Sequence, residues 1–96
     1  MKVLSIVYEI VHDEEKFAEY RAAVMPSLQA HGGRFLARGG HFDVIEGDMP
    51  YQRVVVIEFP SRDAFDGWYN SPEYQAVLPI RMGAADSLFV TVEAVE

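Results

Sequence analysis

The run Arg53-Val-Val-Val-Ile-Glu-Phe-Pro-Ser61 decides the fold of this chain, because its strand-forming residues are apolar on both sides. Val54 and Val56 point one way, and the alternate residues from Val55 to Phe59 point the other. A strand that is apolar on both faces belongs in the middle of a sheet that is covered on both sides. The rest of the chain must therefore supply two layers of cover.

Two elements are predicted at the N-terminal end. Alternating apolar residues predict a first strand over Lys2–Val11, and both of its faces are largely apolar, so it too is expected to be central. A helix is predicted over Glu14–Ala30, with Asp13 as its N-terminal cap. Pro26 lies inside this helix, and because proline removes a backbone donor we expect a kink or a break beside it.

Two further strands are predicted to form a hairpin. The second is expected over Arg34–Glu46 and the third over Tyr51–Phe59, joined by a turn at Gly47–Pro50. Gly39 and Gly40 interrupt the second strand, which indicates a bulge, a sharp bend or a close backbone approach.

The C-terminal part predicts two helical segments and a last strand. Ser61 is expected to cap one helix, and a restart at Ser71-Pro72 predicts a short second helix that Pro79 limits. Connecting chain and a strand over Ser87–Val95 follow. The order β-α-β-β-α-β predicts an α+β, ferredoxin-like fold, with a four-stranded antiparallel sheet and two main helices on one face.

The composition restricts the classes of function. Ninety-six residues suit a single domain over residues 1–96. The net charge of −7 argues against a nucleic-acid or anionic membrane partner, and the lack of cysteine excludes a thiolate nucleophile and a disulfide. No apolar run is long enough to span a membrane, and the N-terminal run lacks the cleavage site of a signal peptide, so we expect a cytoplasmic protein.

The helices of this fold cover only one face of the sheet, so the other face needs a different partner. That face carries apolar side chains from both central strands, whichever way the strands are turned. Such a patch is unusual on a soluble monomer. We therefore predict a homodimer that packs through the open sheet face.

Four stretches of the sequence together resemble a family of small bacterial proteins, the domain of unknown function 1330. They are Phe35-Leu-Ala-Arg-Gly-Gly40, Ile45-Glu-Gly47, Arg53–Ser61 and Trp68-Tyr-Asn-Ser-Pro-Glu-Tyr74. The resemblance covers nearly the whole chain and implies a dimeric α+β barrel, in which two ferredoxin-like sheets close around each other. It implies no activity. Related barrels include cofactor-free monooxygenases, isomerases and haem enzymes, which is an analogy of fold alone.

Charged residues in the predicted hairpin are the first candidates for a site. Arg38, Glu46, Arg53 and Glu58 would be costly inside a sheet unless they are paired. They form salt bridges that hold the structure together, or they line a cleft in which Arg38 or Arg53 grips an anion. Arg53 and Glu58 lie on opposite faces, and the sequence leaves open which of them faces the helices.

Aromatic residues around the helix break are the second candidates. Trp68 and Tyr74 belong to the core, or they form the wall of a ligand pocket that Tyr8 could also reach. Arg81 and Asp86 fix the loop before the last strand, or they close the mouth of that pocket.

Two hypotheses of function follow from these residues. The first is an enzyme that acts on a small anionic or aromatic molecule without a bound cofactor, with monooxygenase-like or isomerase-like chemistry. The second is a dimeric module that binds a metabolite or a protein without turnover. The histidines show no metal-binding spacing, and His41 is the one histidine that we would test for proton transfer. No catalytic residue, cofactor or metal is predicted.

Overall fold

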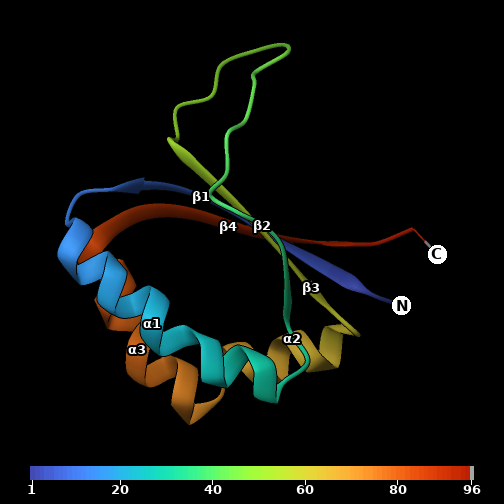
Figure 1. Cartoon of the computed structure of the whole chain (residues 1–96). Coiled ribbons are helices and arrows are strands. Elements are labelled where there is room, and N and C mark those ends of the chain that lie inside the picture. The colour runs from blue at the N-terminus through green and yellow to red at the C-terminus, as the bar shows by residue number, and fades with distance from the viewer. Residues whose placement is uncertain (96) are drawn as a thin grey trace.

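The computed structural model describes residues 1–95, and its sheet has the order β2-β3-β1-β4 with all neighbours antiparallel. Its strands are β1 (Val3–Val11), β2 (Arg34–Arg38), β3 (Arg53–Phe59) and β4 (Ala85–Glu93). Its helices are α1 (Glu14–Ala30), α2 (Arg62–Tyr69) and α3 (Pro72–Ala84). All three helices lie on the same side of the sheet (Figure 1). The ferredoxin-like α+β fold is confirmed, and β1 and β3 are its central strands, as predicted.

The direction of the central strands is now defined. Arg53, Val55, Ile57 and Phe59 face the helices, because these alternate positions are the covered ones, whereas Glu58 faces the open side. In β1 the residues from Val3 to Glu9 at odd positions are all buried. Arg53, and not Glu58, is therefore the charged residue of this strand that faces the helices.

A single apolar cluster fills the space between the helices and the sheet. One stripe of α1 is buried, with Phe17, Tyr20, Val24 and Leu28 no more than 9% exposed. Trp68 and Tyr74 lie under the sheet with ring centroids 4.1 Å apart. The caps Asp13, Ser61 and Ser71 are confirmed, since each side chain accepts a hydrogen bond from the backbone N–H three residues later.

Three of the predicted strands have different boundaries in the structure. The second strand ends at Arg38, not at Glu46, and the segment 39–52 forms an irregular arm that rises from the sheet on the side away from the helices (Figure 1). The third strand begins at Arg53. Gly39 ends β2 with a positive φ of 72°, a conformation that glycine adopts without strain, and this accounts for the interruption. The last strand begins at Ala85 and ends at Glu93, before Val95.

Neither Pro26 nor Pro79 ends its helix, although a kink or break was predicted at Pro26 and a helix end at Pro79. Helix α1 continues through Pro26 without a break, and α3 continues through Pro79 to Ala84, where a connecting segment was predicted. Both prolines are exposed, so the carbonyl that each leaves unpaired can face water. Burial of Leu78 and Ala84 on the same helix favours its continuation. None of the helices within residues 1–95 is long and apolar enough to cross a membrane.

Candidate functional site

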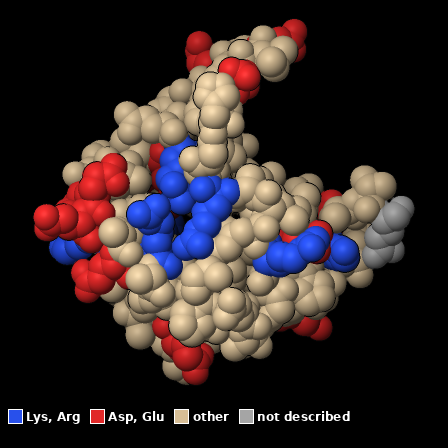
Figure 2. All heavy atoms as spheres, in the orientation of Figure 1, with Lys and Arg blue, Asp and Glu red and all other residues tan. Residues whose placement is uncertain are grey.

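A cavity between α1 and the helix-facing side of the sheet gathers four of the six arginines of the chain. Arg21, Arg38, Arg53 and Arg81 line it, and Glu9 is the one carboxylate among its described lining residues. Four positive charges against one negative charge leave the lining at +3, in a chain whose net charge is −7. Figure 2 shows basic side chains gathered around a hollow below the arm. The cavity holds about 420 Å³ of empty space, counting the solvent at its mouth.

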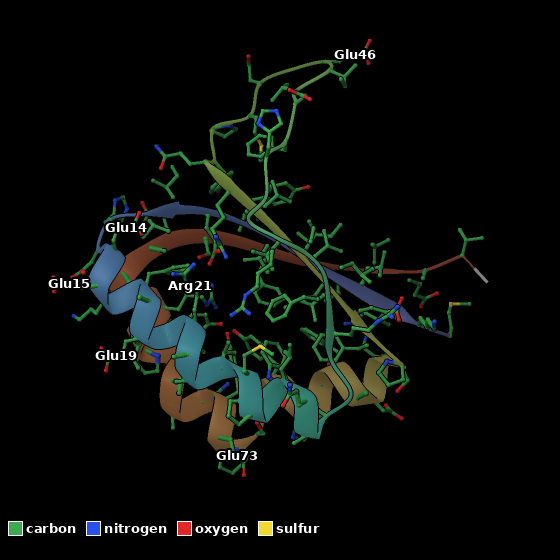
Figure 3. The ribbon with its side chains drawn as sticks, in the orientation of Figure 1. Glu14, Glu15, Glu19, Arg21, Glu46 and Glu73 are labelled. Atoms are coloured by element: carbon green, nitrogen blue, oxygen red, sulfur yellow. The ribbon has the colours of Figure 1, made fainter. Side chains whose placement is uncertain are left out.

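The acidic residues of the helices lie elsewhere. Glu14, Glu15, Glu19 and Glu73 project from the outer surface of the helices, away from the sheet, whereas Arg21 projects from α1 toward it (Figure 3). The cavity is therefore an electropositive site on an otherwise acidic molecule. An anionic ligand would be attracted to it specifically.

Arg38 and Arg21 form the exposed mouth of the cavity. A guanidinium nitrogen of Arg38 donates to the carbonyl oxygen of Arg21 at 3.3 Å, and the Arg38 guanidinium lies over the Phe35 ring, 4.3 Å from its centroid. Partial burial and the nearby charges of Arg21 and Arg53 lower the pKa of Arg38. Three guanidinium groups thus repel one another here, and a bound anion would relieve that repulsion.

Arg53 and Glu9 form an ion pair deeper in the cavity. Arg53 Nε lies 3.4 Å from Glu9 Oε1, within ion-pair distance but not aligned as a hydrogen bond. Gly39 makes room for this arrangement, because the Arg53 guanidinium occupies the space that a Cβ at residue 39 would need. Glu9 is 2% exposed, and burial raises its pKa, although Arg53 and Arg81 oppose the rise. Ser87 Oγ donates to Glu9 Oε2 at 3.4 Å.

A pair of tyrosines joins the cavity to the core. The hydroxyl oxygens of Tyr20 and Tyr74 lie 2.9 Å apart, and burial raises the pKa of Tyr74 while the nearby positive charge of Arg81 opposes the rise. Burial, and then the Tyr74 hydroxyl, raises the pKa of Tyr20 well above its ordinary value, so this phenol stays neutral and can donate a hydrogen bond. Arg81 is 5% exposed, and its Nε has no hydrogen-bond partner among the described residues.

Aromatic and aliphatic side chains form the remaining wall. Trp68 is 1% exposed and donates its indole N–H to Ser27 Oγ at 3.2 Å, which fixes the plane of the ring. Other apolar lining residues are Phe17, Val24, Phe35, Val55, Ile57 and Phe89. The cavity thus combines cations with an apolar surface, as sites for small organic anions require.

The structure brings four of the five candidate residues to one place. Arg38, Arg53, Trp68 and Arg81 line the cavity, whereas Tyr74 lies behind it and is linked to it through Tyr20. Trp68 belongs to the apolar core and also lines the cavity, whereas Tyr74 belongs to the core.

Sequence reasoning missed three polar residues that line the cavity. Glu9 occupies one of the alternate positions of β1 that are buried. A carboxylate at such a position was the signal that could have identified it. Tyr20 was not singled out, because it lies on the buried stripe of α1. Arg21 follows it on the exposed side of α1, and only the length of its side chain brings it to the cavity.

Several other candidates lie away from the cavity. Tyr8 is on the open face, where its ring lies 6.0 Å from that of Tyr51. Glu46 lies at the tip of the arm, not in a strand (Figure 3). Asp86 pairs with His12 at 2.8 Å and does not line the cavity. His41 is exposed in the arm and pairs with Asp43.

Two of the four hairpin charges, Arg53 and Glu58, form ion pairs, and Arg53 pairs with Glu9. Glu58 pairs with Lys2 at 3.4 Å and Arg34 at 3.2 Å. Within residues 1–95, no group of three or more His, Asp or Glu side chains is placed to hold a metal ion.

Solved structures with the same fold come from several bacteria. A protein of unknown function from Rhodopseudomonas palustris is 19% identical, with 99% of this chain and 83% of that chain covered and a TM-score of 0.82. A dimeric ferredoxin-like protein of unknown function from Thermobifida fusca is 19% identical, with 98% and 92% covered and a TM-score of 0.70. SnoaB, a cofactor-independent oxygenase from Streptomyces nogalater, is 14% identical, with 99% and 94% covered and a TM-score of 0.69. These likenesses show the fold alone.

The sequence itself gives a more specific assignment. No curated protein matches the chain. The pattern of the family described as domain of unknown function (DUF1330) matches residues 2–95, which includes every arginine that lines the cavity. The chain therefore belongs to the DUF1330 family.

Proposed function

We propose that this protein binds a small organic carboxylate in the arginine-lined cavity. The observation that carries the proposal is the charge of the lining, which holds four guanidinium groups and one carboxylate in an acidic chain. Arginine presents a planar pair of donors that matches a carboxylate. The apolar wall around Trp68 and Phe89 would contact the carbon skeleton of the ligand.

Two arginines lie at the mouth of the cavity and two lie deeper in it, and this arrangement would orient the ligand. Arg21 and Arg38 are exposed at the mouth, whereas Arg53 and Arg81 are largely covered. A carboxylate held at the mouth would keep much of its contact with water, so less desolvation opposes its binding. The rest of the ligand would then reach toward Glu9 and Tyr20.

Binding is testable through the single tryptophan. Trp68 lines the cavity, so its fluorescence should change when pyruvate, 2-oxobutanoate or phenylpyruvate is titrated into the protein. Arg38→Gln should weaken binding by about tenfold or more, since a hydrogen-bonded charge pair contributes about 1.5–3 kcal/mol. Arg62→Gln is the matched control, because Arg62 lies on α2 outside the cavity. If none of the three acids binds, or if the two variants bind equally well, the proposal is wrong.

We further propose that a second copy of the chain covers the open face of the sheet. Leu88, Val90 and Val92 of β4 are 39–48% exposed there. The arm rises on the same side and carries Ile45, which is 87% exposed (Figure 1). The description of the Thermobifida fusca structure as dimeric supports the same assembly. The site lies on the other face of the sheet, so each copy would hold its own cavity.

A further inference from the structure

We propose that Glu9 is the proton acceptor in a keto–enol proton transfer on a small oxo acid bound in this cavity. The inference rests on the proposed binding of a carboxylate, and it adds a reaction and a base. It favours isomerase-like chemistry, which needs no electron acceptor, over a module that binds without turnover.

The position of Glu9 carries the first step. It lines the cavity from β1 and is 2% exposed, and among residues 1–95 its carboxylate makes only a 3.4 Å ion pair and a 3.4 Å hydrogen bond. A carboxylate held this loosely keeps lone pairs free for a proton. Desolvation also makes it a stronger base than a carboxylate in water, because burial raises its pKa.

The arginines carry the second step, because two of them lie at the mouth of the cavity and two lie next to Glu9. Arg38 and Arg21 at the mouth would hold the carboxylate of the substrate. Arg53 and Arg81 lie next to Glu9, and the Nε atoms of both are buried without a hydrogen-bond partner among the described residues. Such cations are suited to an oxygen that gains negative charge. The substrate class is therefore a carboxylate with a carbonyl group and a C–H bond beside it.

The reaction balances without any other reagent. Glu9 removes a proton from the carbon next to the carbonyl, so the C–H bond breaks and an O–H bond forms on the Glu9 carboxyl group. The C–H electron pair becomes the C=C bond of an enolate, and the carbonyl pair moves onto the oxygen beside Arg53 or Arg81. The carboxylic acid of Glu9 then returns a proton to carbon, and no atom is oxidised or reduced.

The test is the exchange of the carbon-bound protons of 2-oxobutanoate in D2O, followed by proton NMR. The protein should accelerate loss of the CH2 signal over a sample without protein. Glu9→Gln should lower that rate by about 100-fold or more, within the range that general base catalysis contributes, while Trp68 fluorescence still reports binding. Glu9→Asp should restore part of the rate, because it restores a carboxylate.

The control is Glu58→Gln, which makes the same chemical change on the opposite face of the sheet and should leave the exchange rate unchanged. Circular dichroism checks that each variant is folded, and Glu9→Asp provides the second variant if Glu9→Gln does not fold. If 2-oxobutanoate binds but its protons do not exchange faster, or if the Glu9 variants exchange at the wild-type rate, Glu9 is not the base, and the binding proposal survives. If no oxo acid binds, both proposals fail together.

Discussion

Glu9 is a carboxylate in an apolar layer, and at the scale of single residues it makes stability depend on pH. Burial raises its pKa above the ordinary value of 4.5, against the opposing effect of Arg53 and Arg81. The folded protein therefore holds this proton more tightly than the unfolded chain does. The contribution of Glu9 to stability is complete below the unfolded pKa and is lost as the pH rises through the folded pKa.

We predict that the wild type loses stability relative to Glu9→Gln as the pH is raised from about 4.5 toward neutrality. Urea unfolding of both proteins across this range measures the difference, and the titrations of all other groups cancel to first order. A difference that stays constant, or that grows in favour of the wild type as the pH rises, would contradict a raised pKa for Glu9.

Individual residues of the candidate site were predictable from the sequence where a local pattern indicates that the residue is buried. Charged residues in an apolar strand indicated Arg53, and the helix break indicated Trp68. Arg21 gives no such signal, because it lies on the exposed side of its helix and reaches the cavity only through its long side chain. The depth of each arginine in the cavity depends on tertiary packing, which no local pattern reports.

At the scale of elements, the end of α1 depends on two glycines, and the usual rules for helix ends explain only the first of them. Gly32 takes a positive φ of 78°, as expected at a helix C-terminus. Gly33 donates its N–H to the Leu28 carbonyl at 2.9 Å and lies against the core. A Cβ at residue 33 would lie 2.7 Å from Leu28 Cγ and 3.0 Å from Phe59 Cε1.

We predict that Gly33→Ala lowers the free energy of unfolding by about 1–3 kcal/mol, because Leu28 and Phe59 are fully packed and cannot move aside freely. Gly40→Ala is the matched control, since no atom lies within 4 Å of a Cβ built there, and its effect should stay within about 0.5 kcal/mol. Urea unfolding measures both. Equal stabilities of the two variants would show that Leu28 and Phe59 accommodate the added Cβ without loss of stability.

The elements themselves were predictable to the extent that caps and periodicity define them. The starts of all three helices follow from Asp13, Ser61 and Ser71, each confirmed as a cap. The continuation of α3 through Pro79 did not follow, because the local cost of proline is outweighed by burial of the next turn. Residues 39–46 of the arm were predicted as strand and 47–50 as a turn, yet most residues of the arm are exposed in the single chain.

At the scale of the whole molecule, the open face of the sheet is the reason for the proposed dimer. Ile6 lies at the centre of the open face, directly opposite Val56 on β3 and Val90 on β4. One layer of helices covers the other face (Figure 1), and the cavity lies between α1 and that face. Cover is needed on both sides because the central strands carry apolar residues on both faces. The same strands thus line the cavity on one face and present an apolar surface on the other.

We predict that the wild type sediments as a dimer at micromolar concentration and that Ile6→Asp sediments as a monomer. The new carboxylate would be buried between two apolar sheets with no partner for its charge, which opposes association strongly. Met82→Asp is the matched control, because Met82 is 64% exposed on α3 in the helix layer, and this variant should remain a dimer. A monomeric wild type would overturn the assembly, whereas a dimeric Ile6→Asp would place the interface elsewhere. Because the cavity lies on the opposite face, monomeric Ile6→Asp should still bind 2-oxobutanoate if it is folded, and a loss of binding in the folded monomer would show that the site depends on the partner copy.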